Sequence, residues 1–287
     1  MLQTKQWLIN QLKGDSDGDK WGHRYRGVQY ARFKSLEKII LNTIDIKQKY
    51  DILDIGCSHG DFTKIIKNDF VNSSIFATDI AVEAIEATKE YLDLKNNYVE
   101  VSTLPEIAFS DKLFDIIFSI EVLYYLNKQD RIKSVEDIYQ KLNNNGYYIF
   151  TSVIDDGSRY FTENDAIDLI SSKFKIIKVD YIYTKLAVKF ESIFIKIENF
   201  YKVLNKIDKD YKCGNPTILK KFIISILKNN IIKNIVKMLL YPFYFISKKI
   251  VRNKNLMYFI TKITKKYFPK QSKAIIVIIG RKVIDEK

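Results

Sequence analysis

The segment Asp51–Gly60 (DILDIGCSHG) constrains the fold of this chain more than any other part of the sequence. The apolar residues of Asp51–Ile55 favour an extended strand and lack amphipathic alternation, as is typical of a parallel strand covered on both faces. Gly56 and Gly60 then allow a tight turn and a close approach to a ligand, which a Cβ atom would obstruct. A helix is expected to follow at about Phe62–Lys67.

A strand, a glycine-bounded loop and a helix together form a place where a nucleotide-like cofactor can bind. A dinucleotide fingerprint requires G-x-G-x-x-G, and a phosphate-binding P-loop ends in Gly-Lys-Ser/Thr. The loop Gly56-Cys57-Ser58-His59-Gly60 contains neither pattern. The spacing therefore argues against a loop that grips phosphates.

Strands and helices alternate along the chain around this unit, which predicts a parallel sheet with helices on both faces. Further strands are expected at 74–78, 98–103, 114–120, 147–153, 175–183 and 274–279, and further helices at 30–44, 82–92, 131–142 and 164–174. Asn143–Gly146 is expected to end the third of these helices as a C-terminal stop. If the last two strands pair as a hairpin, residues 185–270 are an insertion into a complete sheet.

The net charge of +13 belongs to one segment. Residues 185–270 contain 20 basic residues (Lys and Arg) and 4 acidic residues (Asp and Glu). The remaining residues contain 27 basic and 30 acidic residues. From Tyr211 to Lys270 there are 14 basic residues and no acidic one. The partner of this segment must therefore be sought separately from the cofactor.

The basic segment is expected to form helices, with a cap at Asn215-Pro216 and breaks at Pro242 and Pro269. At Leu256–Phe268 the pattern is amphipathic. Lys262, Lys265 and Lys266 share one face, and Leu256, Ile260, Ile263 and Tyr267 share the other. Three interpretations stay open: an anionic membrane surface, a nucleic-acid arm or a substrate lid. The apolar content argues against nucleic acid.

The cellular setting follows from what the sequence lacks. Cys57 and Cys213 are far apart, so no disulfide framework is implied and a reducing cytoplasm is expected. Residues 1–20 have no apolar core of the signal-peptide kind. No segment approaches the ~20 apolar residues of a membrane-spanning helix. No metal site is predicted.

Two carboxylates follow predicted strands at the edge where ligands bind in an open α/β sheet. Asp79 lies 19 residues after Gly60 and can accept hydrogen bonds from both ribose hydroxyls. Its alternative role is to cap the next helix, and the glycine loop favours the ligand role. Glu121, between Ile120 and Val122, is either paired or desolvated, and both states prepare a carboxylate for work on a proton.

These segments resemble the class I S-adenosylmethionine-dependent methyltransferases, and more narrowly the family of the nodulation-factor N-methyltransferase and related sugar-modifying enzymes. Asp54–Gly60 matches the Asp-x-Gly-x-x-x-Gly pattern and reads Gly-Cys-Ser-x-Gly, while Ser119–Leu126 reads Ser-x-Glu-Val-Leu-Tyr-Tyr-Leu. Asp19–Arg24, with Tyr30, Arg32 and Lys34, resembles the N-terminal element of that family, with different spacing. The resemblance covers about Asp19–Val153, and the basic insertion is not part of it.

The resemblance implies a Rossmann-like, doubly wound, seven-stranded, mostly parallel sheet with a helical basic insertion before the last strand. It also implies S-adenosylmethionine as cofactor. Asp54, Gly56, Cys57, Ser58 and Gly60 would line its methionine and ribose parts, Asp79 and Ile80 its ribose, and Thr103 and Leu104 its adenine. Ser119 would offer its carbonyl to the cofactor's amino group. Trp21 and Arg24 would close over the cofactor as a lid, or pack in a loop.

The acceptor's proton needs a base if the acceptor is a hydroxyl, whereas an amine only has to be held neutral. Glu121 and His23 are the candidate bases, and Tyr124 is a third candidate catalytic residue. The alternative role of both His23 and Tyr124 is packing. His59 is expected to face solvent or to cap the following helix.

The expected organisation has four parts. Residues 1–44 form a helical lid or substrate element, 45–184 the cofactor-binding core, 185–270 the basic insertion and 271–287 the final strand. The expected function is methyl transfer to an amine or hydroxyl of a sugar, glycan precursor or related small molecule, in the cytoplasm and at the inner face of a membrane. The alternatives are an RNA methyltransferase and a non-catalytic binding module.

Overall fold

The computed structural model describes residues 7, 9–10, 19, 22–95, 98–158, 160–207 and 225–283. They divide into two compact units. The sheet unit comprises the described residues within 1–24, 32–183 and 273–287. The helical unit comprises those within 25–31 and 184–272.

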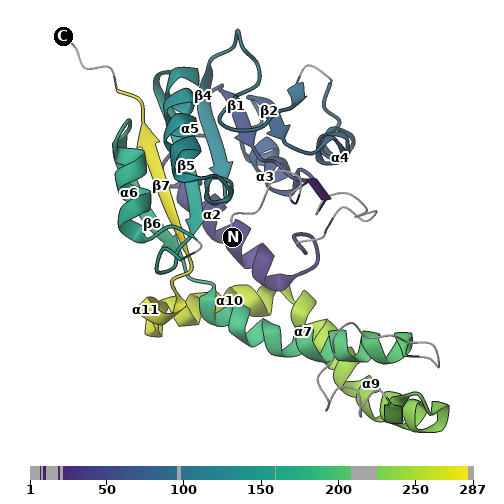
Figure 1. Ribbon diagram of the computed structural model, residues 1–287. Coiled ribbons are helices and arrows are strands. Elements are labelled where there is room, and N and C mark those ends of the chain that lie inside the picture. Colours follow the sequence, from purple (N-terminus) through teal and green to yellow (C-terminus); the bar gives the residue numbers. More distant parts are fainter. Residues whose placement is uncertain are drawn as a thin grey trace. The chain divides into compact units, whose positions relative to one another are not determined.

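The sheet unit is built on seven strands in the order β3-β2-β1-β4-β5-β7-β6 (Figure 1). Strands β1 to β5 are parallel, and β7 is antiparallel to its neighbours β5 and β6. The strands are β1 (Asp51–Ile55), β2 (Ser74–Asp79), β3 (Val99–Val101), β4 (Phe114–Ile120), β5 (Leu142–Val153), β6 (Lys175–Ile182) and β7 (Ile275–Arg281). The predicted hairpin of the last two strands, with the basic segment inserted between them, is therefore present.

Helices cover both faces of this sheet because neighbouring residues of a strand point to opposite faces. Ile116 and Phe118 of β4 belong to a core shared with α2 (Gly27–Leu41) and α3 (Asp61–Asp69). Ile117, between them, belongs to the opposite core. That second core is shared with α5 (Lys128–Lys141) and α6 (Glu163–Ser171), while α4 (Val82–Leu92) follows β2. The predicted doubly wound α/β fold is confirmed.

The strand register brings the candidate site together. Ile55 of β1 is level with Thr78 of β2 and with Ser119 of β4. The residues that follow these three positions therefore emerge at one edge of the sheet. They lead into the glycine loop, Asp79 and Glu121.

The prediction that Asn143–Gly146 ends a helix is wrong. Helix α5 ends at Lys141, and β5 begins at Leu142, which pairs with Phe114. The strand accommodates the asparagines because its register shifts in the Phe114–Ile116 region, and the Asn143 side chain donates to Asp115 Oδ1 at 2.8 Å. Strand β3 is also shorter than the predicted 98–103.

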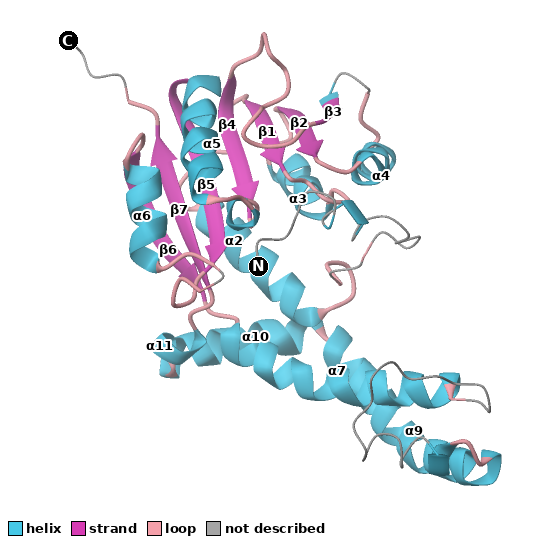
Figure 2. Ribbon diagram, viewed as in Figure 1, coloured by secondary structure: helices cyan, strands magenta, loops and turns pink. Residues whose placement is uncertain are grey.

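Figure 2 shows the helices of the helical unit whose bounds are given by the described residues. They are α7 (Lys185–Lys206), α9 (Asn230–Arg252), α10 (Lys254–Tyr267) and α11 (Pro269–Ser272). The side chains of Asn229 and Asn253 accept backbone N–H bonds at the starts of α9 and α10. Asn215-Pro216, where a cap was predicted, lies outside the described residues.

Two details of the predicted helices change. Pro242 lies inside α9 and does not break it. Proline has no N–H to donate to the carbonyl of Met238, four residues earlier. Both Pro242 and Met238 are exposed. In α10 the buried residues are Met257, Thr261 and Thr264, whereas Tyr267 of the predicted apolar face is 62% exposed. In the part of the chain that the structure describes, no helix has the length and apolar character needed to cross a bilayer.

Candidate functional site

The loop after β1 depends on left-handed backbone that glycine adopts readily. Gly56 and Gly60 have φ angles of 75° and 77°. A Cβ atom on Gly56 would also lie 2.4 Å from Cγ2 of Val122, so no larger residue fits there. Ser58 is left-handed too, with φ 51°. Its backbone is held at both ends, because its N–H donates to Asp79 Oδ2 at 2.9 Å and its carbonyl accepts from Thr88 Oγ1 at 2.8 Å.

Asp79 links the loop to the helix that follows β2. Its other oxygen, Oδ1, accepts the N–H of Ala81 at 3.1 Å. The residue that caps α4 is Ala81, so Asp79 joins two segments and is not the N-cap itself. Burial raises the pKa of Asp79, and the backbone donors oppose that rise. Each carboxylate oxygen accepts one bond from Ser58 or Ala81 and retains a second lone pair, which fits a pair of ribose hydroxyls.

Asp54 lies beneath this loop, turned toward α3. Its carboxylate is 2% exposed and accepts a hydrogen bond from Thr63 Oγ1 at 2.6 Å. Burial raises the pKa of Asp54 to about 7, and the nearby charge of Asp79 acts in the same direction. The side chain therefore links the end of β1 to α3.

The other residues that were predicted to bind the cofactor differ in their exposure. Cys57 and Leu104 are buried, Ile80 and Thr103 are half-buried, and Arg24 is exposed. Ser119 is buried with its hydroxyl 2.9 Å from that of Tyr148, so its side chain belongs to the core and only its backbone is left for a ligand. Trp21 lies outside the described residues.

Glu121 is paired, one of the two states expected for it. Its carboxylate is 13% exposed and accepts from Arg32 Nη1, at 3.0 Å to Oε1 and 3.1 Å to Oε2. Its backbone is left-handed, with φ 61°, and its N–H donates to the carbonyl of Thr151. A non-glycine residue in this conformation costs of order 1–3 kcal/mol and persists only where its surroundings hold it.

Arg32 connects the two candidate bases. Its Nη2 lies 3.5 Å from Nε2 of His23. A guanidinium group can only donate, so Nε2 must accept and the ring proton is assigned to Nδ1. Nδ1 lies 3.8 Å from Asp61 Oδ2. Neither Glu121 nor His23 is thus a free base while Arg32 stays in place.

Arg32 was not among the residues predicted for the site. It was named only as part of the N-terminal Tyr/Arg/Lys element. Its spacing to Glu121, 89 positions, gave no signal of contact. On the same side of the site, Asp61 accepts from Arg24 Nε at 2.8 Å, and the Arg24 guanidinium lies 4.6 Å from the ring centre of Tyr91.

Tyr124 packs near this cluster and stays protonated. Burial raises its pKa well above the ordinary value, and the Glu121 charge adds to the rise. Its ring lies edge-on to that of Tyr160, with centroids 4.9 Å apart. Tyr124 can donate a hydrogen bond to a substrate but cannot serve as a base near neutral pH.

The prediction for His59 is wrong. The residue is 4% exposed, so it does not face solvent, and Gly60 occupies the N-cap position of α3 without any side-chain cap. The His59 ring nitrogen Nδ1 lies 3.4 Å from Ser58 Oγ. The left-handed backbone on either side of His59 folds this part of the loop inward.

The strand order with antiparallel β7, the glycine loop after β1 and the acid at the end of β2 define a class of protein. The fold and the site confirm the predicted resemblance to the class I S-adenosylmethionine-dependent methyltransferases. S-adenosylmethionine is therefore its methyl donor, as predicted.

Comparison with known proteins agrees with this assignment. The family model described as a methyltransferase domain matches residues 53–148. Malonyl-[acyl-carrier protein] O-methyltransferase from Calditerrivibrio nitroreducens is 29% identical over 154 residues, 50% of this chain and 58% of the relative. Nodulation protein S from Azorhizobium caulinodans is 26% identical over 132 residues, 44% of this chain and 62% of the relative. The chain thus spans less than two thirds of both relatives.

A solved structure shows the same fold. It is the N-methyltransferase NodS from Bradyrhizobium japonicum WM9 in complex with S-adenosyl-L-homocysteine. The two chains superpose with a TM-score of 0.50 at 20% identity, over 62% of this chain and 90% of NodS.

We predict that Asp79→Ala abolishes measurable S-adenosylmethionine binding, because it removes the ribose acceptor and frees the Ser58 and Ala81 N–H groups. Asp79→Asn keeps one acceptor and should weaken binding about tenfold, the loss expected for a charged hydrogen bond. Titration calorimetry measures both, with the exposed Asp111→Ala as control. An unchanged affinity of the Asp79→Ala variant would show that the ribose site lies elsewhere.

We also predict a pH-dependent stability that Asp54 controls. Its pKa is about 7 in the folded protein and 3.8 in the reference state, so between these values the folded chain holds a proton that the unfolded chain has lost. Stability from this group therefore falls as pH rises through that window. Asp54→Asn keeps an acceptor for Thr63 and cannot ionise. In urea unfolding, the advantage of the variant over the wild type should grow from about pH 4.5 to about pH 8, and a constant difference would contradict the raised pKa.

Proposed function

We propose that this protein transfers the methyl group of S-adenosylmethionine to an amine or hydroxyl of a sugar, glycan precursor or related small molecule. The observation that carries the proposal is the Glu121–Arg32–His23 cluster beside the glycine loop. A strand end that bears a paired carboxylate, next to a cofactor loop, is where an acceptor and its proton would be handled. The names of the relatives support a small acceptor but do not identify it.

The cofactor supplies a methyl group already activated on a sulfonium. The residues of this chain then have to hold the acceptor in line and manage one proton. In this proposal Gly56, Ser58 and Gly60 follow the cofactor closely, and Asp79 accepts from its ribose. Ile80, Thr103, Leu104 and the Ser119 carbonyl line its remaining parts, with Trp21 and Arg24 as the lid.

The state of the candidate bases favours an amine as acceptor. Glu121 is bound by Arg32, Nε2 of His23 accepts from Arg32, and Tyr124 is protonated. A neutral amine attacks without prior removal of a proton, whereas a hydroxyl requires a base that is free during the reaction. For a hydroxyl acceptor, Arg32 has to release Glu121 or His23 first.

A carboxylate acceptor is the second candidate. It needs no base, and Arg32 Nε is buried with no hydrogen-bond partner within the described residues, so a donor is left for an anionic group. A relative named as an O-methyltransferase that acts on malonyl-[acyl-carrier protein] supports this candidate. An RNA methyltransferase and a non-catalytic module are the remaining alternatives, and the exposed apolar residues of the helical unit argue against RNA.

For the setting, we propose the cytoplasm, at the inner face of a membrane. The absence of a disulfide framework in the sequence supports a reducing compartment. A lipid-linked acceptor would be found at such a surface. This part of the proposal is independent of the acceptor's reacting atom.

A screen of labelled methyl transfer tests the proposed function. The purified protein and S-adenosylmethionine with a labelled methyl group are added to lipid-linked, RNA and small-molecule fractions of a cell extract. We expect label in the small-molecule or lipid-linked fraction, stable to mild base if the acceptor is an amine and lost as a methyl ester if it is a carboxylate. Label in RNA alone would overturn the proposal, and cofactor binding without transfer to any fraction would favour the non-catalytic module.

We predict that Glu121→Gln slows turnover more than it weakens cofactor binding. The amide can still accept a bond from Arg32, but it carries no charge to stabilise the cationic product of an amine acceptor, or to take the proton of a hydroxyl acceptor once Arg32 has moved. We expect a loss of roughly 10²-fold in turnover. Single-turnover rates and calorimetry separate the two effects, with Glu136→Gln on the surface as matched control. Small and equal effects on both would remove Glu121 from the catalytic residues.

A further inference from the structure

All carboxylates of the helical unit that the structure describes are buried and neutralised. Glu191 is 0% exposed and accepts from Arg26 Nε and Nη2, and from the N–H of Val28. Glu198 is 4% exposed and pairs with Arg252 at 3.4 Å. The exposed charges on the described part of this unit are therefore positive. Glu191 and Glu198 therefore do not offset the charge of the exposed lysines on the described part of this unit.

Helix α9 has two apolar faces, and one of them is packed. Val236 and Leu240 contact the cluster of Leu204, Ile207 and Leu227. Farther along the same face, the Tyr244 ring stacks on that of Tyr201, with centroids 4.4 Å apart. Ser247 and Val251 complete this face and are each 1% exposed. The spacing of four, eight, eleven and fifteen residues from Val236 is that of one side of a helix.

The opposite face of α9 is apolar and exposed. We call it the α9 stripe, and it consists of Ile231, Ile235, Met238, Leu239, Phe245 and Ile246, with exposed fractions of 72, 50, 69, 62, 45 and 52%. These positions lie four, seven, eight, fourteen and fifteen residues from Ile231, so they share one side of the helix. An exposed apolar band of this length on a helix is typical of an interaction surface.

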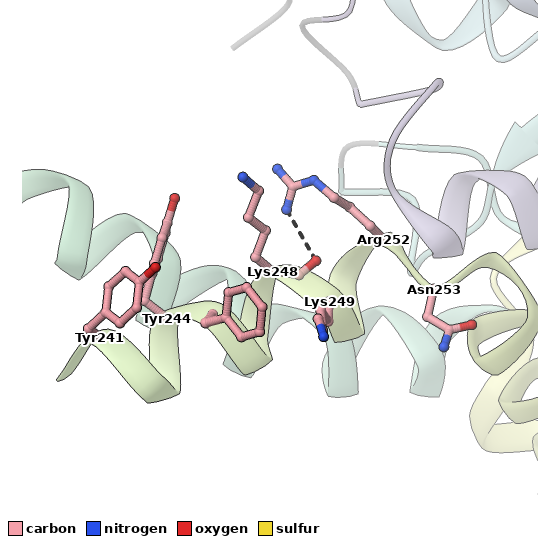
Figure 3. A pocket seen from close by; sticks show the side chains of 7 residues that line it. Tyr241, Tyr244, Lys248, Lys249, Arg252 and Asn253 are labelled. Atoms are coloured by element: carbon pink, nitrogen blue, oxygen red, sulfur yellow. Dashed lines mark hydrogen bonds between the residues drawn. The ribbon is translucent and has the colours of Figure 1, made fainter. Parts of the chain in front are cut away.

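Basic and aromatic side chains border the C-terminal end of this stripe. They line an open hollow formed by Tyr241, Tyr244, Phe245, Lys248, Lys249, Arg252 and Asn253 (Figure 3). Lys248 and Arg252 extend to the same side of α9 in this view, and Lys249 Nζ lies 4.5 Å from the Phe245 ring centre. Amphipathic rings next to cations are typical of side chains at the boundary between acyl chains and lipid headgroups.

We propose that the α9 stripe lies in the surface of an anionic lipid bilayer, with Lys248 and Lys249 against the headgroups. This inference deepens the proposed function and rests on the proposed location at the inner face of a membrane. A helix that lies in the interface needs an apolar face with basic residues at its border, and α9 has both and carries no acid. Anionic lipid then complements a surface whose exposed charges are positive.

Other occupants of the stripe fit less well. Nucleic acid would bind the cations but leave Ile231, Met238 and Leu239 in water. A second copy of this chain would cover the apolar residues, but it would bring two positively charged surfaces together. Lipid is the partner that satisfies both properties.

Vesicle flotation of the full chain tests the proposal. The vesicles contain phosphatidylcholine alone or with about 30% phosphatidylglycerol, at about 0.1 and 0.5 M salt. We expect the wild type to float with the anionic vesicles only. The Met238→Ser/Leu239→Ser double variant should bind at least about tenfold more weakly at both salt concentrations, because lipid affinity scales with buried apolar area.

A second double variant tests the charge. The Lys248→Gln/Lys249→Gln variant should bind anionic vesicles about thirtyfold more weakly than the wild type at low salt, which is the fold-change for about 1 kcal/mol per basic residue. At high salt the difference between the variant and the wild type should be smaller. Val71→Ser in the sheet unit is the matched control, since Val71 is 73% exposed and Met238 69%. Calorimetry with S-adenosylmethionine, which does not depend on lipid binding, confirms that each variant is folded.

The outcomes distinguish lipid binding by the α9 stripe from methyl transfer at the candidate site. Flotation without methyl transfer would support the α9 stripe and reject the proposed function, and the reverse result would reject the stripe alone. No flotation of the wild type, or flotation that both double variants retain unchanged, would overturn the proposal. So would a dimer that depends on Met238 and Leu239, seen by sedimentation, or binding to RNA in place of vesicles.

Discussion

The two hydrogen bonds that Asp79 accepts are the interaction on which the site depends. One holds Ser58 in the loop after β1, and the other holds Ala81 at the start of α4. They keep a non-glycine residue in a left-handed conformation, which would otherwise be unfavourable. The same carboxylate that would bind the ribose thus shapes the loop in advance, and this preorganisation reduces the ordering cost of cofactor binding.

A second constraint concerns charge at the end of β4. Glu121, Arg32, His23 and Asp61 form a chain of contacts between segments that are distant in sequence, with the two acids at its ends. Such a network is suited to a partly dry site, because each carboxylate has a basic neighbour. It also means that the reactivity of Glu121 is governed by a helix residue, Arg32, and not by the strand that carries it.

The sheet, its order of elements and the cofactor loop could be predicted because they depend on local pattern. The apolar run of β4 and the Asp54–Gly60 spacing are visible in a few consecutive residues. Arg32 could not be found, since its role depends on a contact between α2 and the end of β4. The burial of His59 could not be predicted either, because it follows from the backbone torsions around that residue. The position of Pro242 inside a helix could not be predicted, because it is tolerated only where that side of α9 is exposed. For the same reason the α9 stripe became visible only once the packed face of the helix was known.

The contact between Gly56 and Val122 has a further consequence. There is no room for one additional carbon atom between the donor loop and the residue next to Glu121. A bound acceptor that displaced the end of β4 would therefore also displace the loop that follows β1. In that case the two substrates would be thermodynamically linked, so that the affinity for one would depend on whether the other is bound.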